Sequence, residues 1–249
     1  MRATVKHLLG VLGRGSKAGI FFLCASTAVA GNYSVSPLNL EFTPQKKSAV
    51  ITVTNDDKRI LNLRVRPTRW LQDAKGVDTY QDTGDLIVFP RQLNIKPGDK
   101  KIIRVGINEL PQAGENAYRL YIEELAPPQE PKNNQTRLSV LVNIGVPIFA
   151  STQKLHPLLQ ITQLPSSSPK NLEFNIVNAG NMHARIGQIV TADNQIVSQA
   201  STVRYVFPGV TRLLTVPLTP ALCTGGNKQL KFETDEELLS IETIFPEKC

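Results

Sequence analysis

Side chains that could carry out chemistry are few in this chain, and their spacing does not group them. The sequence has three histidines and three cysteines, and beyond residue 30 the histidines are His156 and His183. No third ligand accompanies them at metal-binding spacing. There is no Gly-x-Ser-x-Gly nucleophile motif, no His-Glu-x-x-His zinc motif and no phosphate-binding glycine loop. The sequence therefore argues against an enzyme, and we expect no catalytic residue, no metal ion, no nucleotide and no other cofactor.

The first 30 residues have the pattern of a secretory signal peptide. Four basic residues and no acidic one precede an apolar run, Ala18–Ala30, which ends in Ala-Val-Ala. The alternative is a membrane anchor, but the run is shorter than the roughly 20 apolar residues that cross a bilayer. We therefore expect cleavage after Ala30 and a soluble exported protein, with residues 1–30 removed.

The charge of the chain does not indicate a nucleic-acid partner. The leader holds four of the 28 basic residues and none of the 21 acidic ones, so it accounts for part of the formal net charge of +7. Beyond the leader, no cluster of lysine and arginine is interleaved with aromatic residues. Such a cluster is what nucleic-acid binding requires.

Two cysteines remain beyond the leader, Cys223 and Cys249. Export would place them in an oxidising compartment, where a disulfide is expected in preference to two free thiols. We therefore predict one disulfide in the C-terminal half, joining the end of the chain to a preceding strand.

Short apolar runs with a period of two recur along the chain and predict an all-β fold. In Ile60–Arg66, for example, aliphatic residues alternate with polar ones, and turns rich in glycine, proline, asparagine and aspartate separate such runs. Trp70 is expected to lie in a core, and the polar stretch Asp73–Asp85 is expected to be a loop. The frequency of strands predicts two immunoglobulin-like β-sandwich domains, residues 31–150 and a smaller domain of residues 151–249.

A long strand pattern extends from residue 138 to residue 146. Its alternating aliphatic residues fall on one face, and smaller or more polar residues fall on the other. A loop rich in proline and asparagine, residues 126–135, precedes it. Two interpretations are open from the residues alone: the row packs on this protein's own core, or it is offered to another protein. The row consists of Leu138, Val140, Val142, Ile144 and Val146.

Several motifs, taken in order, resemble those of a known family. The chain is similar to the periplasmic pilus-assembly chaperones of the chaperone–usher pathway, and most similar to the branch associated with spore-coat-U-like fimbriae. The similarity extends over nearly the whole chain beyond the leader, with the specific motifs in the first domain. These motifs are Tyr33–Pro37, Ser48–Asn55, Val88–Pro90, Leu93–Gly98, Ile103–Val105, Glu115–Leu125 and Val146–Phe149.

The resemblance implies two immunoglobulin-like domains set as an L and a periplasmic chaperone without catalytic activity. Its partners would be pilus subunits, which are sandwiches that lack a final strand, and the outer-membrane usher that receives them. In donor-strand complementation the chaperone lends the missing strand, as in other cases of strand addition. This would place the row from Leu138 to Val146 in the groove of the subunit. Whether free copies associate through the same strand stays open.

The resemblance also implies basic residues in the cleft between the domains, which hold the C-terminal carboxylate of the subunit. Arg119 matches the arginine in the Tyr-Arg-Leu motif of the family branch and is the first candidate, with Arg104 and Lys154 as weaker ones. The alternative for Arg119 is a solvated or salt-bridged residue. The chain departs from the best-known members, because Asn39 stands where they carry arginine and residues 138–153 contain no Lys or Arg.

Two other functions are compatible with an exported β protein. An adhesin or binding module would show loops with clustered aromatic residues, but the chain has five tyrosines and one tryptophan, mostly inside strand patterns. A pilus subunit would be a single incomplete domain with a free N-terminal donor segment, whereas this pattern indicates two domains. Both alternatives are therefore less well supported than a chaperone.

Overall fold

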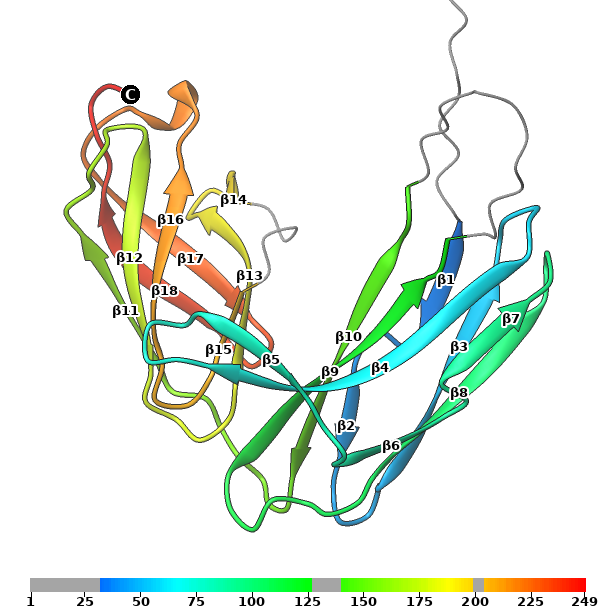
Figure 1. Ribbon diagram of the computed structural model, residues 1–249. Coiled ribbons are helices and arrows are strands. Elements are labelled where there is room, and N and C mark those ends of the chain that lie inside the picture. The colour runs from blue at the N-terminus through cyan, green and yellow to red at the C-terminus, as the bar shows by residue number, and fades with distance from the viewer. Residues whose placement is uncertain (1–31, 127–139, 199–203) are drawn as a thin grey trace, which may run out of the picture.

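The computed structural model describes residues 32–126, 140–198 and 204–249. Figure 1 shows two β-sandwiches set at an angle, one from each half of the chain. This confirms the expected all-β fold of two immunoglobulin-like domains in an L-shaped arrangement. The predicted leader, the cleavage expected after Ala30 and Leu138 of the predicted row all lie outside the described residues. Within them, no helix has the length and apolar character needed to cross a membrane.

The first sandwich consists of β1 (Tyr33–Ser36), β2 (Leu40–Phe42), β3 (Ser48–Asn55), β4 (Leu61–Gln72), β5 (Asp78–Asp82), β6 (Leu86–Phe89), β7 (Gln92–Ile95), β8 (Lys100–Ile107), β9 (Glu115–Glu124) and β10 (Asn143–Ser151). One sheet has the order β1-β3-β8-β6, and the other has the order β2-β10-β9-β4-β5, with β7 also pairing with β4. Alternating burial turns one face of each sheet inward. Fully buried side chains such as Leu63, Ile103 and Leu120 fill the core between the sheets.

The first strand segment changes sheets at Pro37, and this leaves one edge of β10 open. β1 pairs with β3 in one sheet, whereas β2 runs parallel to β10 in the other. The β2 ladder covers only Ile148–Ala150, whereas β9 pairs with all of β10 on the opposite side. From Asn143 to Pro147, the edge of β10 therefore has no strand partner within the described ranges.

The polar stretch Asp73–Asp85 is not simply a loop, and that expectation is wrong. It contains β5, which pairs antiparallel with the end of β4 from Thr68 to Gln72. Residues of β5 are exposed or half-buried, so the strand lacks the apolar alternation on which the prediction depended. The β4–β5 hairpin extends from the first sandwich to the second (Figure 1), and the main-chain carbonyl of Ala74 accepts a hydrogen bond from the amide of Thr211 there at 3.1 Å.

The second sandwich consists of β11 (Leu159–Leu164), β12 (Asn171–Asn178), β13 (Ala184–Thr191), β14 (Ile196–Ser198), β15 (Arg204–Val206), β16 (Thr211–Pro217), β17 (Asn227–Thr234) and β18 (Leu238–Ile244). Its sheets have the orders β11-β12-β16 and β14-β13-β17-β18, with β15 also pairing with β13. Phe174 and Phe232, both fully buried, meet edge to face with ring centroids 5.2 Å apart in its core.

Both sandwiches contain the same buried turn device. Asn55 ends β3 and Asn178 ends β12, and neither side chain is exposed. The main-chain carbonyl of each accepts a hydrogen bond from a turn glycine, Gly98 at 2.9 Å and Gly209 at 2.8 Å. These glycines have φ angles of 74° and 75°, a conformation that favours glycine. The device fixes the loops at one end of each sandwich.

The predicted pairing of Cys223 with Cys249 agrees with the structure, although Cys223 lies outside the strands. Cys223, which follows the short 3-10 helix η2 (Pro220–Leu222), is bonded to Cys249 across 26 residues of sequence, with Cα atoms 5.8 Å apart. The bond ties the C-terminal residue to the second sandwich.

Candidate functional site

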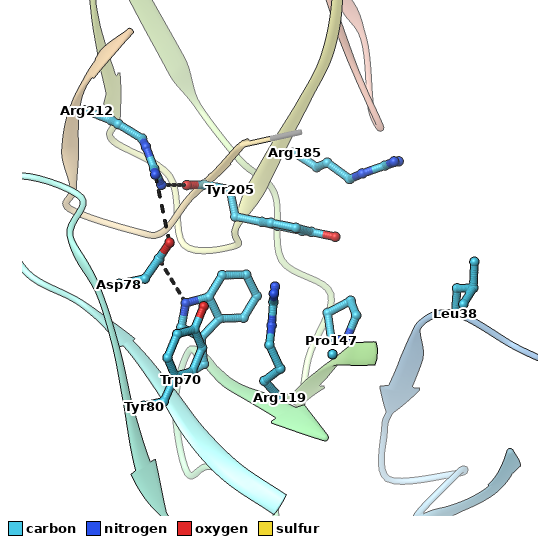
Figure 2. Close-up of a pocket in the computed structure, with 10 residues that line it drawn as sticks. Leu38, Trp70, Asp78, Tyr80, Arg119, Pro147, Arg185, Tyr205 and Arg212 are labelled. Atoms are coloured by element: carbon cyan, nitrogen blue, oxygen red, sulfur yellow. Dashed lines mark hydrogen bonds and ion pairs between the residues drawn. The ribbon is translucent and has the colours of Figure 1, made fainter. Parts of the chain in front are cut away.

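A pocket of about 330 Å³ lies where the two sandwiches meet. Figure 2 shows its side chains converging from both domains and from the β4–β5 hairpin. Aromatic and arginine side chains dominate it, and one aspartate contributes. The pocket is lined by Leu38, Trp70, Asp78, Tyr80, Arg119, Gly145, Pro147, Arg185, Tyr205 and Arg212.

Arg119 projects from β9 into this pocket and is held by aromatic rings. The carbon of its guanidinium lies 4.1 Å from the ring centroid of Trp70 and 5.7 Å from that of Tyr80. Such cation–π contacts hold an arginine without neutralising it. Its buried Nε has no hydrogen-bond partner, and no described acidic residue forms an ion pair with it. Arg119 therefore presents an uncompensated positive charge at the cleft.

Gly145 of β10 gives Arg119 the space to reach the pocket. A Cβ built on Gly145 would lie 3.0 Å from Cδ and 3.3 Å from Cγ of Arg119. Because Gly145 pairs directly with Tyr121 in the neighbouring strand, that Cβ would also meet the Tyr121 ring at 3.3 Å. A larger residue would displace the Arg119 side chain, so the glycine is a positioning residue of the pocket.

The other charged residues of the pocket are already engaged in part. Arg212 donates to the main-chain carbonyl of Tyr205 at 2.9 Å and lies 3.8 Å from a carboxylate oxygen of Asp78. Asp78 also accepts a hydrogen bond from the indole N–H of Trp70 at 2.9 Å. Arg185 pairs with Asp235 at 3.0 Å. Asp78 thus contacts Trp70 and Arg212 but not Arg119, so Arg119 remains free to bind an external anion.

Two tyrosines add neutral hydroxyl groups. Burial raises the pKa of Tyr80 to about 12, although the positive charge of Arg119 acts in the opposite direction. Burial also raises the pKa of Tyr205, against the lowering effect of Arg185 and Arg119. Both hydroxyls therefore stay protonated near neutral pH and can donate hydrogen bonds to an anion.

Contacts between the domains fix the walls of the pocket. Trp70 packs edge-on against Tyr205 and Phe207 of the second sandwich, with ring centroids 5.0 and 4.8 Å apart. The amide side chain of Gln72 donates to the carbonyl of Tyr205 at 2.9 Å and accepts from the amide of Phe207 at 2.9 Å. Trp70 is buried as expected, but its place is this interdomain cluster.

A second interdomain contact lies at the start of β9. The carboxylate of Glu115 accepts from the main-chain amide of His183 at 2.9 Å and lies 2.8 Å from its ring nitrogen Nδ1. The His183 ring stacks on Phe149 with centroids 3.5 Å apart. This contact gives His183 a structural role.

The described residues of the predicted donor row change from exposed to buried along the chain. Val140 is 45% exposed, Val142 and Ile144 are half-buried against the first core, and Val146 is fully buried within it. Leu138 lies outside the described residues. The row therefore faces its own core at Val146 and reaches the surface toward Val140, next to the open edge of β10.

The three predicted anchoring residues are not brought together. Arg119 lines the pocket, whereas Arg104 is exposed on β8 in the opposite sheet, where its strand neighbours are Val50 and Phe89. Lys154 is exposed in the connection between β10 and β11 and does not line the pocket.

Most of the aromatic and arginine residues that line the pocket could not be inferred from the sequence. Tyr80 belongs to a stretch interpreted as a loop, and Arg185, Tyr205 and Arg212 come from the second domain, for which no motif was available. The available signal was one aromatic residue just before the Asp73–Asp85 stretch, Trp70, and one inside it, Tyr80. In the described part of the chain, no group of three or more histidine, cysteine or acidic residues is arranged to hold a metal ion.

Comparisons with known proteins identify the first sandwich. Residues 33–156 match the family model described as pili and flagellar-assembly chaperone, PapD N-terminal domain. No curated protein sequence is significantly similar to the chain.

Several solved structures have the same two-domain fold. One is a chain of the Csu chaperone–tip adhesion subunit pre-assembly complex of Acinetobacter baumannii, from archaic chaperone-usher pili, with 19% identity and a TM-score of 0.63 over 85% of this chain and 97% of that chain. Another is from the Salmonella enterica SafA pilin–SafB chaperone complex, with 11% identity and a TM-score of 0.57 over 88% and 99%. The CupB2 chaperone of Pseudomonas aeruginosa has 12% identity and a TM-score of 0.56 over 85% and 100%. At these identities the likeness establishes the fold, and the family model, which spans the whole first sandwich, establishes that the chain belongs to the pilus-assembly chaperone family.

Proposed function

We propose that this protein is a periplasmic chaperone that binds pilus subunits by lending them the exposed part of its β10 region, and that it delivers them to an outer-membrane usher. The single observation that carries the proposal is the open edge of β10. Next to it lies an apolar row that is partly exposed, and the edge ends beside the Arg119 pocket. The family membership supports the chaperone role, and the periplasmic location rests on the family and on the sequence pattern of residues 1–30.

The donor row of the proposal is Val140, Val142 and Ile144. These side chains share a face with Val146, which is already committed to the chaperone's own core. A subunit that lacks a strand would pair with the free edge from Asn143 onward and cover the row. Complete burial of an aliphatic side chain contributes roughly 1.5–3 kcal/mol, and only the part that is still exposed adds to binding.

Arg119 would fix the register of the lent strand by binding the C-terminal carboxylate of the subunit. The pocket provides a guanidinium with no acidic partner among the described residues, beside two neutral tyrosine hydroxyls. A carboxylate accepts both hydrogen bonds of a guanidinium fork, which gives geometric specificity. Arg104 is remote from the pocket, so we do not include it in the anchor.

The open edge also has a consequence for the free protein. An unpaired strand edge with exposed aliphatic side chains can pair with a second copy. Such self-association would protect the edge until a subunit arrives, and it would compete with subunit binding. The proposal therefore includes it as a state of the free chaperone.

Replacing Arg119 with glutamine tests the anchor of the proposed function. We expect the Arg119→Gln protein to fold and to bind a pilus subunit from the same fimbrial gene cluster about 30-fold more weakly, because a charge-assisted hydrogen bond to the carboxylate is lost. Affinity is measured with subunits that end in a free carboxylate or in an amide made by peptide ligation. The wild type should prefer the carboxylate, and the variant should show a much smaller preference.

Arg64→Gln is the matched control. Arg64 lies on β4, is 57% exposed and pairs with Glu123 at 2.7 Å outside the pocket. Its loss removes an arginine and an ion pair but should leave subunit affinity unchanged. Equal affinity of Arg119→Gln for the carboxylate subunit would show that the anchor is elsewhere.

A further inference from the structure

The cleft contains a second arginine that faces the same space as Arg119 but comes from the other domain. Arg185 lies on β13 directly opposite Tyr205 of β15, so the two side chains share one face of the sheet. Figure 2 shows Arg185 and Tyr205 extending together toward the space into which Arg119 points from the first domain. All three line one pocket.

Of the two pocket arginines that have an acidic partner, Arg185 is the more easily released for a ligand. Arg212 is fixed by the carbonyl of Tyr205 and by Asp78, and its side chain is 21% exposed. Arg185 is 41% exposed, and its ion pair with Asp235, which is 52% exposed, is a surface pair. Exposed pairs of this kind contribute little to stability, so exchanging Asp235 for a ligand carboxylate costs little.

The charges in the pocket also favour a role for Arg185 in binding an anion. The positive charges of Arg119 and Arg185 both lower the pKa of Tyr205 against the effect of its burial, and all three side chains line the same pocket. Two cations of different domains facing each other across a polar pocket repel when the pocket holds no anion. A carboxylate between them would remove this repulsion and could accept from both arginines and from Tyr205.

We propose that Arg185, supported by Tyr205, is a second ligand for the C-terminal carboxylate of the bound subunit, so that the anion is held by both domains. This inference rests on the proposed function and deepens it. It also supplies the basic residue that the sequence lacks in residues 138–153 and at Asn39, because the missing charge comes from the second sandwich. A ligand held from both sides restrains the angle between the sandwiches, which couples subunit binding to the shape of the cleft.

The test compares two variants that break the same ion pair in opposite ways. Arg185→Gln removes the proposed ligand, and we expect affinity for the carboxylate subunit to fall about tenfold, with affinity for the amide subunit unchanged. Asp235→Asn removes the competitor of the ligand, and we expect affinity to stay equal or to increase. Arg185→Lys keeps the charge and should recover part of the loss.

The outcomes separate this inference from the proposed function. If Arg185→Gln binds like the wild type, or if Asp235→Asn weakens binding as much as Arg185→Gln does, the second ligand is refuted. A carboxylate preference that still depends on Arg119 would then leave the proposed function standing. If Arg119→Gln also keeps the full preference, the anchor itself is refuted.

Discussion

Replacing Val140 with aspartate should abolish subunit binding while the protein stays folded. Val140 is 45% exposed in the free protein and precedes β10, so a carboxylate there remains hydrated. In the proposed complex the side chain enters an apolar groove, where a buried and unpaired charge costs several kcal/mol. This corresponds to at least about 1,000-fold in affinity. Co-purification from periplasm and a thermal melt of the variant measure the two effects.

The adjacent residue provides the matched control. Leu141 is 44% exposed, nearly the same as Val140, but with the alternating pattern it falls on the opposite face. Leu141→Asp should retain both the fold and the subunit. If the two variants lose the subunit equally, the effect comes from the loop and not from one face of a lent strand. If Val140→Asp keeps its partner, donor-strand binding through this row is refuted.

The period-two pattern was sufficient to predict the sandwiches but not the boundary within the row. Alternation identifies which residues share a face of a strand, and Val142, Ile144 and Val146 do pack on the same core. It does not identify what covers that face at each point. The change from exposed Val140 to fully buried Val146 depends on where the opposite sheet ends, which is a property of the assembled domain.

The candidate pocket was predictable only at Arg119, because a local motif marks that residue. Its aromatic support comes from residues distant in sequence: Trp70 and Tyr80 meet Arg119 through the pairing of β4 with β9 and with β5. The strand β5 carries mostly exposed polar side chains, and its stability comes from pairing at a sheet edge, for which a single sequence has no apolar signal.

The contacts between the domains were the least predictable part. The pair of Glu115 and His183 joins residues 68 positions apart, and each looks like an ordinary surface residue within its own domain. Neither periodicity nor a turn signal reports which faces of two sandwiches meet. Arg185 could not be placed near Arg119 for the same reason.

Replacing Asn178 with alanine should cause the largest loss of stability among the polar residues discussed. The buried side chain donates to the carbonyls of Met182 and Val206, both at 2.8 Å, and accepts from the amides of Leu158 at 3.2 Å and Gly180 at 3.0 Å. Each buried group that loses its partner costs about 1–3 kcal/mol. Because some of these groups lie near the surface and can reach water, we expect the free energy of unfolding to fall by about 4 kcal/mol.

Asn94→Ala is the control for this prediction. Asn55→Ala, at the equivalent buried position of the first sandwich, is a second test. Asn94 makes one exposed side-chain hydrogen bond, to Asn62 at 2.8 Å, so its loss should change the free energy of unfolding by less than about 0.5 kcal/mol. Asn55 makes the corresponding buried contacts in the first sandwich, to the carbonyls of Arg59 at 2.8 Å and Ile95 at 2.9 Å. Denaturant unfolding of all three variants measures the effects. If Asn178→Ala is as stable as Asn94→Ala, water replaces the amide at no cost, and the side-chain hydrogen bonds of Asn178 are not what holds the loops at this end of the second sandwich.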